Sequence, residues 1–370
     1  MKAKSEYMDY YLGIDSDGTY TRAVLVTAKG DVHATGQAGP ANYHKIGLAT
    51  ATANLRAATA TAWDMLGLPF QPAAAAFLGC AGVKSTTDIA QLTFAAGNAG
   101  LAPIGKIIVS NDLHNALAGG LAGRPGIALI AGAGTNCLGR DASGATFMCG
   151  GWGWLLDDEG GGTGLAIAAM RAVTRAARRP CARHPAPACA AGFSRTLRAQ
   201  STARVYVQPW TPDQLAAFTP VVVRLAGQGD ATAIMLIAEG AVALARLVQG
   251  SADALDFPAG PEVVILGGCA RSGPPYQSMS ESCIRAAVPG ARIVEPVYST
   301  THGAALNALR VAGITPLPAL RFSEIKQTIC YNPLRGSSPL STTHLCGARA
   351  KQESNESKVA QTSSNYARHP

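Results

Sequence analysis

The chain has 370 residues, is 48% hydrophobic and carries a formal net charge of +8. A chain of this length is too large for one ordinary core, so two domains are expected. Nine cysteines are scattered without C-x-x-C pairs, which argues against a zinc site and a disulfide framework and favours a reducing, cytoplasmic location.

Strand and helix patterns alternate through the N-terminal part of the chain, as an α/β fold requires. The first strand leads into a turn of small residues that begins at Asp15, and a later one delivers Asp112 to the start of a helix. The strands expected here are Tyr11–Ile14, Arg22–Val26, Val32–Gln37, Ala73–Leu78 and Lys106–Ser110, and the helices are Ile46–Leu66, Thr86–Ala96 and Leu113–Leu121.

The second part of the chain repeats this style, and its pattern ends after Pro316. The elements expected here are strands from Ile127, Cys137 and Thr146 and at Glu262–Leu266 and Arg292–Val294, and helices at Thr163–Ala177, Asp230–Gln249, after Pro275 and at Gly303–Val311. From about Arg321 onward the chain is polar and aperiodic, which predicts a disordered tail.

Neither a leader nor a membrane span is expected. The first nine residues are polar and lead directly into a strand pattern, unlike a signal peptide. The most apolar helical stretch, Ala231 to Val248, contains Glu239 and Arg246, so the sequence predicts no membrane association.

An arginine block accounts for much of the positive charge and contains no acidic residue. Its members are Arg171, Arg175, Arg178, Arg179, Arg183, Arg195, Arg198 and Arg204. Because aromatic residues are almost absent among them, the block favours a solvated insertion or helix face over a nucleic-acid surface. No nucleic-acid partner is therefore expected.

A dense run of glycines between Gly126 and Gly164 is the strongest indication of function. It contains the loop Ala131 to Cys137, the motif Cys149 to Trp154 and the motif Asp157 to Gly162. Glycines inside a hydrophobic context are costly for the fold unless backbone must approach a ligand or direct N–H groups at an anion. The alternative is a glycine-rich hairpin between ordinary strands.

The turn at Asp15 offers a second candidate for phosphate binding. A carboxylate that ends a strand beside turn N–H groups suits a hydrated Mg²⁺ and the phosphates it accompanies. No Gly-Lys-Ser/Thr follows, and the turn leads to a strand, so it is neither a P-loop nor a dinucleotide fingerprint. An aspartate that only forms the turn is the alternative.

These features, in this order, resemble the sugar kinase/Hsp70/actin superfamily and, more closely, the N-acetylglucosamine kinase branch grouped with the BadF/BadG/BcrA/BcrD ATPase family. The resemblance covers roughly residues 10–312, is poor at 178–220, and depends most on Gly134–Cys137, Cys149–Gly153 and Asp158–Gly160. It implies an α/β protein of two ribonuclease-H-like domains of the actin/hexokinase type, with the active site in the cleft between them. The implied division is 8–115, 116–318 with a last helix able to pack back on the first domain, and a disordered tail at 319–370.

The resemblance also implies a role for each motif. Asp112 would be the catalytic base, Asp15 would hold Mg²⁺ through water, and Asp112 with Asn42, Gly151, Trp152 and Asp158 would bind the sugar. The residues implied to bind ATP are Gly18, Thr19, Gly132, Gly134, Thr135, Asn136, Gly267 and Gly268. For Asp112 the alternative is a helix N-cap, and Trp154 is expected in the core.

The implied reaction is phosphoryl transfer from Mg-ATP to the 6-hydroxyl of an amino sugar, either N-acetylglucosamine or glucosamine. Such an enzyme mainly aligns the acceptor, neutralises charge and positions a base. Two departures from the family pattern, Asp17 in the first loop and Ala133 in the second, keep open a sugar- or nucleotide-binding sensor with little turnover. The related activase ATPases need clustered cysteines, which Cys137, Cys149 and Cys269 do not form. The oligomeric state stays open, a homodimer included.

Overall fold

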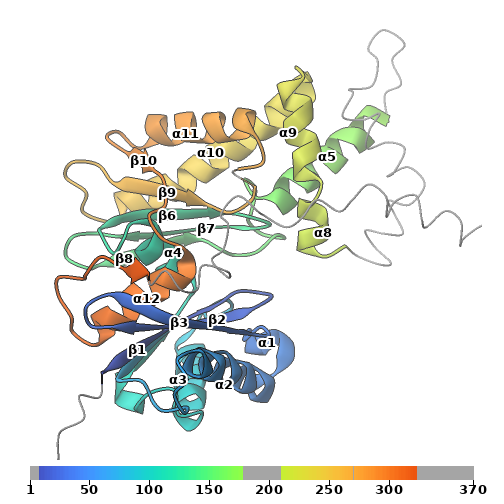
Figure 1. Cartoon of the computed structure of the whole chain (residues 1–370). Helices are drawn as coiled ribbons and strands as arrows, with labels where there is room; N and C mark the ends of the chain where they lie inside the picture. The colour runs from blue at the N-terminus through green and yellow to red at the C-terminus, as the bar shows by residue number, and fades with distance from the viewer. Residues whose placement is uncertain (1–7, 178–209, 270, 323–370) are drawn as a thin grey trace, which may run out of the picture. The chain divides into compact units, whose positions relative to one another are not determined.

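The computed structural model describes residues 8–177, 210–269 and 271–322, which form two sheets and the helices around them (Figure 1). The strands are β1 (Tyr10–Ser16), β2 (Thr21–Thr27), β3 (Asp31–Ala38), β4 (Ala75–Cys80), β5 (Ile107–Ser110), β6 (Gly126–Ala131), β7 (Thr135–Arg140), β8 (Thr146–Gly150), β9 (Glu262–Leu266), β10 (Arg292–Val294) and β11 (Arg321–Phe322). The helices are α1 (Tyr43–Ile46), α2 (Leu48–Met65), α3 (Thr86–Asn98), α4 (Leu113–Gly120), α5 (Gly162–Ala177), α8 (Pro212–Ala216), α9 (Thr219–Gly227), α10 (Ala231–Asp253), α11 (Pro274–Ala287) and α12 (Thr300–Val311), with a short 3-10 helix at Ile104–Lys106.

The first sheet has the strand order β11-β3-β2-β1-β4-β5. Strands β1, β2 and β3 pair in antiparallel fashion, whereas β4 and β5 continue the sheet parallel to β1. Alternate side chains of β1 and β2 enter two cores: Leu12 and Leu25 face α2, and Val24 and Val26 face α12. The sheet is therefore covered on both faces.

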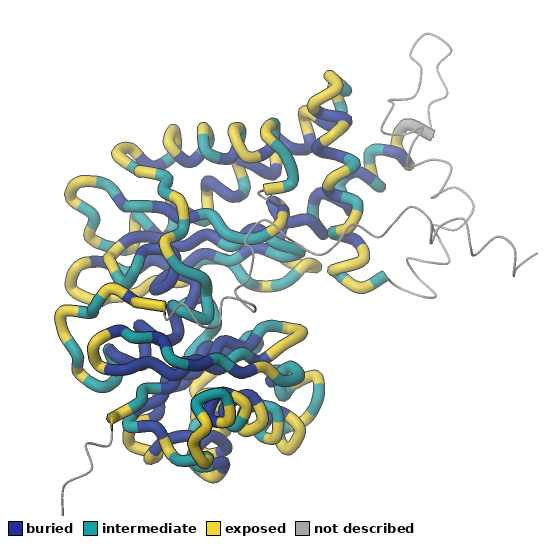
Figure 2. The backbone as a smooth tube through the Cα atoms, viewed as in Figure 1, coloured by how far each residue is buried: buried dark blue, intermediate teal, exposed yellow. Residues whose placement is uncertain are grey.

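The second sheet repeats this arrangement in the order β10-β9-β6-β7-β8. Strands β6, β7 and β8 are antiparallel neighbours, and β9 and β10 continue the sheet parallel to β6, as β4 and β5 do beside β1. Helices α10 and α11 lie along one face (Figure 1), and α4 contacts the other through Leu113 and Leu117. Figure 2 shows the buried strands at the centre of both sheets. The expected α/β class is thus confirmed, with one topology used twice.

Helices α4 and α12 cross closely between the two sheets. A Cβ atom on Gly303 would lie 2.0 Å from the carbonyl oxygen of Asn115, and one on Gly119 would lie 2.3 Å from that of Ser299. Only glycine permits this approach. Because α12 also packs on β1, the last helix returns to the first sheet.

Helix α10 differs from the sequence expectation. By length and composition it is apolar enough to cross a membrane, which the presence of Glu239 and Arg246 was expected to prevent. Its buried residues include Leu236, Ile237 and Leu244, which belong to the core of the second sheet. A helix that packs along one face of a sheet needs a long apolar stripe for the same reason that a membrane span does.

The expected start of the tail at residue 319 also needs correction. Leu320 is buried, and β11 pairs parallel to β3, so the first sheet gains an edge strand from beyond Pro318. A two-residue strand has no periodicity to find in a sequence. The predicted disorder from residue 323 onward and most of the arginine block lie outside the described residues.

Two further differences are local. The helix expected from Ile46 to Leu66 is divided by Gly47, whose φ of +80° ends α1 before α2 begins. Trp154, expected in the core, is 39% exposed, in a loop where Leu155 and Leu156 are also exposed.

Candidate active site

The site residues of the first sheet gather because β1, β4 and β5 are parallel. Asp15 lies at the carboxyl end of β1, Gly82 follows β4, and Asn111 and Asp112 follow β5. Parallel strands bring their carboxyl ends to one edge of a sheet, where open α/β folds commonly bind ligands. Asn111 ties two of these loops together, since its Nδ2 donates to the carbonyl of Val83 at 3.1 Å.

A hollow of about 300 Å³ lies at this edge. Asp112 and Leu113 line one part of it, and residues 132–136 with Gly151 and Asp158 line the rest. The structure therefore brings together the expected catalytic residue, the second glycine loop and two of the expected sugar-pocket residues.

Asp112 does not cap α4 as a conventional N-cap residue would. Its backbone is already helical, at φ −61° and ψ −21°, and its side chain makes no capping bond. Asn111 takes that role instead, since its Oδ1 accepts from the N–H of Leu113 at 3.0 Å. Burial, and then the nearby charge of Asp15, raise the pKa of Asp112 to about 7. The alternative of an N-cap aspartate is thus not supported, and the carboxyl is poised for proton transfer near neutral pH.

Asp15 is held by groups from two helices. Its Oδ2 accepts from Thr300 Oγ1 at 2.6 Å, and its Oδ1 accepts from Asn115 Nδ2 at 3.1 Å. Burial raises the pKa of Asp15, and the bonds from Thr300 and Asn115 oppose that shift. Besides burial, the charge of Asp15 raises the pKa of Asp112, and a hydrated divalent cation, which needs only one or two carboxylates, would relieve this repulsion. The described residues contain no cluster of three or more His, Cys, Asp or Glu side chains that could hold a metal ion.

The second glycine loop lies beside the glycines that follow β9. Gly267 has a φ of +101°, and a Cβ there would lie 2.4 Å from the carbonyl oxygen of Ala131. Cys269 N–H donates to that same oxygen at 2.9 Å. Gly268 and, in the first loop, Gly18 have open space around them. The residues expected to bind ATP thus form two packed loops on the second sheet and one turn on the first.

Asp158 supports this loop rather than projecting alone into the hollow. Its Oδ1 accepts from the N–H of Thr135 at 2.5 Å and from the Thr135 hydroxyl at 3.3 Å, and a Cβ on Gly134 would meet its carboxylate. Its backbone has a φ of +66°, which is rare for a residue other than glycine and marks local strain. Burial raises the pKa of Asp158, and the Thr135 bonds oppose the shift.

Asn42 carries a buried acceptor with no partner, its Oδ1 atom. The side chain lies against Gly82, where a Cβ would come within 2.8 Å of it. A buried unsatisfied acceptor is costly, so a donor from a ligand is the natural complement. Across the site, Gly151 has a φ of +78° and lies against the side chain of Asn136. Trp152 is 76% exposed, and neither Trp152 nor Asn42 is among the residues that line the hollow.

Sequence reasoning missed three side chains that the fold brings to this site: Lys84, Asn115 and Thr300. Asn115 stands one helical turn after Asp112, a spacing that places both on one helix face. Lys84 Nζ donates to the carbonyl of Gly151 at 3.1 Å, and Thr300 lies in the first turn of α12. No local pattern links either residue to its partner far along the chain.

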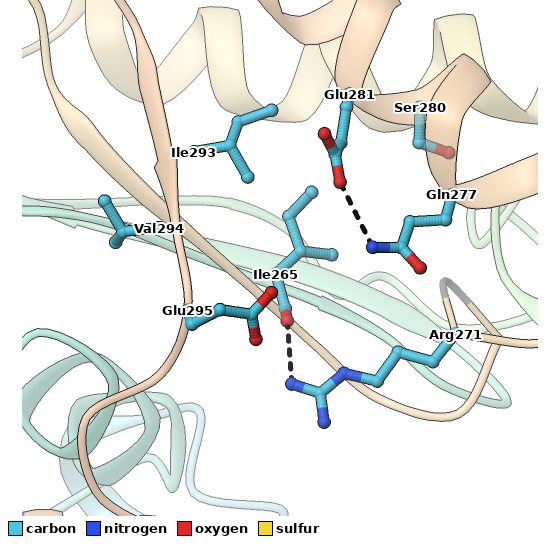
Figure 3. A pocket seen from close by; sticks show the side chains of 8 residues that line it. All are labelled: Ile265, Arg271, Gln277, Ser280, Glu281, Ile293, Val294 and Glu295. Carbon is cyan, nitrogen blue, oxygen red and sulfur yellow. Dashed lines mark hydrogen bonds between the residues drawn. The ribbon is translucent and has the colours of Figure 1, made fainter. Parts of the chain in front are cut away.

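A second, smaller hollow lies between α11 and the edge formed by β9 and β10 (Figure 3). Arg271 donates to the carbonyl of Ile265 at 3.3 Å there, and Gln277 donates to Glu281 at 3.2 Å. Its volume of about 30 Å³ holds little more than water. The larger hollow is therefore the candidate active site.

The fold is of the actin/hexokinase type. A Chromobacterium violaceum structure described as a candidate N-acetylglucosamine kinase matches with a TM-score of 0.62 at 24% identity, over 82% of this chain and 99% of that chain. A Porphyromonas gingivalis structure with the same description matches with a TM-score of 0.59 at 19% identity, over 81% and 99%. These similarities confirm the expected fold.

Within that class, the chain belongs to the BadF/BadG/BcrA/BcrD ATPase family, whose model matches residues 12–308. An N-acetylmuramic acid/N-acetylglucosamine kinase from Clostridium acetobutylicum is 33% identical over 168 residues, which are 45% of this chain and 54% of that relative. The chain thus matches about half the length of this relative. The family resemblance expected from the sequence is confirmed.

Proposed function

We propose that this protein is an ATP-dependent kinase that phosphorylates an amino sugar at the 6-hydroxyl. N-acetylglucosamine and glucosamine are the candidate substrates from the sequence, and the relative from Clostridium acetobutylicum adds N-acetylmuramic acid. The observation that carries the proposal is the Asp112 carboxyl, which makes no capping bond to α4, has a pKa of about 7 and lies in a hollow that glycine loops line.

Phosphoryl transfer asks the protein to align the acceptor and remove its proton. Asp112 would accept the proton of the 6-hydroxyl, since its carboxyl is deprotonated on the alkaline side of about pH 7. The unpaired Oδ1 of Asn42 would accept a hydrogen bond from another hydroxyl of the ring. Gly151 and Asp158 would complete the sugar pocket from the second sheet.

The nucleotide would lie along the glycines of the second sheet. The turn at Gly18 and the loop from Gly132 would face its phosphates, and Gly267 and Gly268 would face the adenosine. Asp15 would hold Mg²⁺ through water, and the ion would supply neutralisation of phosphate charge. We extend the proposal to the remaining expectations from the sequence: a cytoplasmic protein that acts on a small molecule, with domains at 8–115 and 116–318 and with the last helix packed back on the first domain.

An ADP-release assay against a panel of sugars with Mg-ATP tests this function. The kcat/KM for N-acetylglucosamine or glucosamine should be at least about tenfold higher than that for glucose, because a misplaced or unpaired polar group in the bound sugar strongly lowers the efficiency of its phosphorylation. Product analysis should place the phosphate on the 6-oxygen. Equal turnover of glucose and both amino sugars would contradict the assigned substrate class.

A second candidate is a sugar- or nucleotide-binding sensor with little turnover. Two observations favour it. The Asp17 carboxylate in the first loop accepts hydrogen bonds from the N–H groups of Thr19 and Tyr20, and the Asp158 carboxylate accepts from the N–H and the hydroxyl of Thr135. In both loops a protein carboxylate therefore uses donors that the kinase proposal assigns to phosphate. Calorimetric binding of sugar or nucleotide without ADP release would establish the sensor in place of the kinase.

A further inference from the structure

Lys84 bridges the two sides of the candidate active site. It lies in the loop after β4, and its Nζ donates to the carbonyl oxygen of Gly151, one of the residues that line the hollow. Lysine has three donors and this bond uses one of them, so two remain for a ligand. The Lys84 ammonium also acts to lower the pKa of Asp158, which lines the hollow.

The base of this side chain is firmly held. Asp88 Oδ2 accepts from the N–H of Lys84 at 2.9 Å and from that of Ser85 at 2.8 Å. The other oxygen of Asp88 accepts from the Tyr43 hydroxyl and lies 3.0 Å from His44 Nε2. These contacts fix the backbone of the loop from which the Lys84 side chain extends towards Gly151.

Lys84 is also close in the chain to the proposed sugar contact. Gly82 touches the Asn42 side chain, and Lys84 follows two residues later in the same loop. A sugar bound against this loop would have both the Asn42 acceptor and the Lys84 ammonium available to its substituents. The carboxylates of Asp112 and Asp158 would repel an anionic substituent, so a fixed cation is what such a substrate requires.

We propose that Lys84 is a specificity-determining residue that binds a carboxylate carried by the sugar. This inference rests on the proposed amino-sugar function. The interaction is a charge-assisted hydrogen bond, which is stronger and more selective than one between neutral groups. N-acetylmuramic acid, which has a carboxylate on an ether arm, is the probe, and N-acetylglucosamine is the neutral counterpart.

The test compares kcat/KM for these two sugars in the parent chain, Lys84→Met and Lys84→Arg. We expect Lys84→Met to lower the ratio of N-acetylmuramic acid to N-acetylglucosamine efficiency about tenfold or more, and Lys84→Arg to preserve most of it. Lys106→Met is the matched control, because that exposed lysine lies before β5, at the opposite end of the strand from Asp112. Calorimetric binding of each sugar to each variant repeats the comparison without turnover.

Each outcome is decisive. An equal loss with both sugars would assign Lys84 to the nucleotide or the transferred group and overturn the inference. A parent chain that phosphorylates N-acetylglucosamine but neither phosphorylates nor binds N-acetylmuramic acid would overturn the inference and leave the proposed function standing. A parent chain that binds both sugars and phosphorylates neither would remove the kinase function, and the binding ratio would then decide the role of Lys84.

Discussion

Asp17 and Arg22 form an ion pair across the turn between β1 and β2, with Nη1 of the arginine 2.9 Å from Oδ2 of the aspartate. The other carboxylate oxygen accepts from the N–H groups of Thr19 and Tyr20 at 2.7 and 2.8 Å. Burial acts to raise the pKa of Asp17, but the bonds from Arg22 and from the two N–H groups leave it lowered. Asp17, which departs from the family loop, is therefore a carboxylate paired within the turn and not an unpaired charge.

We expect Asp17→Gly to lower the KM for Mg-ATP several-fold. The change frees two N–H donors in the proposed phosphate turn and removes a negative charge from it. The lost ion pair is partly exposed and contributes about 0.5 kcal/mol to stability, so the melting temperature should change little. Asp31→Asn, which breaks an ion pair elsewhere on the same sheet, is the control. A higher KM for Mg-ATP would mean that Asp17 helps to bind the nucleotide.

Local patterns predicted the elements that position the site. The strand that ends at Ser110 and the helix that follows were both expected, so Asp112 could be placed at the carboxyl end of a strand from the sequence alone. The glycine loop after β6 was equally visible, because glycines in an apolar context are rarely neutral for a fold. These features depend on neighbours in the chain, which a sequence displays directly.

Contacts between distant segments could not be predicted in this way. Asp15 and Thr300 are hydrogen-bonded although they are 285 positions apart, and Lys84 and Gly151 are 67 apart. Such pairs depend on how the helices pack, which the Gly303–Asn115 approach permits. Trp154 was placed in the core by its residue type alone, and its exposure in a loop is set by tertiary structure.

We expect Asp15→Asn and Thr300→Val to separate metal binding from packing. Asp15→Asn keeps an oxygen that accepts from Thr300 but loses the charge, so it should raise the Mg²⁺ concentration needed for half-maximal turnover and cripple kcat. Thr300→Val removes one hydrogen bond, which should cost about 1 kcal/mol of stability with little change in the Mg²⁺ requirement. Mg²⁺ titrations and melting curves of both variants provide the comparison. An equal shift of the Mg²⁺ requirement in both would assign Asp15 to packing.

Titration of Asp112 should give the profile of kcat against pH an acidic limb. Because its pKa is raised to about 7, kcat should rise with pH up to about 7 and then level off. Asp112→Asn cannot take the proton, and turnover should become undetectable while sugar binding stays within a few-fold of the parent. A variant that keeps about a tenth or more of the parent kcat would refute the assignment of the base.

The raised pKa of Asp112 also predicts how the stability of the protein depends on pH. A carboxyl whose pKa is raised by folding contributes stability at low pH that is lost as pH rises towards the folded pKa. Asp112→Asn should therefore melt a few degrees higher than the parent at pH 8, and at a similar temperature near pH 4. Melting curves at the two pH values measure the difference, and a lower melting temperature of the variant at pH 8 would contradict the raised pKa.

Truncation should distinguish the strand β11 from the residues after it. A chain that ends at Pro318 loses buried Leu320, the N–H bond from Arg321 to Gly30 at 2.8 Å and the Arg321–Asp31 ion pair at 2.7 Å. We expect a loss of about 2 to 3 kcal/mol, most of it from the leucine. A chain that ends at Phe322 should have the same melting temperature as the full-length protein, because the polar, aperiodic sequence beyond it has no apolar face to bury. Equal melting temperatures of the two truncated chains would show that β11 contributes nothing.

The unpaired acceptor of Asn42 should report on sugar binding. Its Oδ1 is buried without a partner in the structure, so removing it by Asn42→Ala should leave the melting temperature unchanged or slightly raised. The same change removes a bond that forms only with the sugar, and KM for the amino sugar should rise about tenfold. Asn307→Ala is the matched control, because that buried asparagine donates to the carbonyl of His114 at 3.0 Å in the protein itself. The control should lower the melting temperature and leave KM unchanged. Loss of stability in Asn42→Ala with an unaltered KM would place Asn42 in the fold and not in the sugar site.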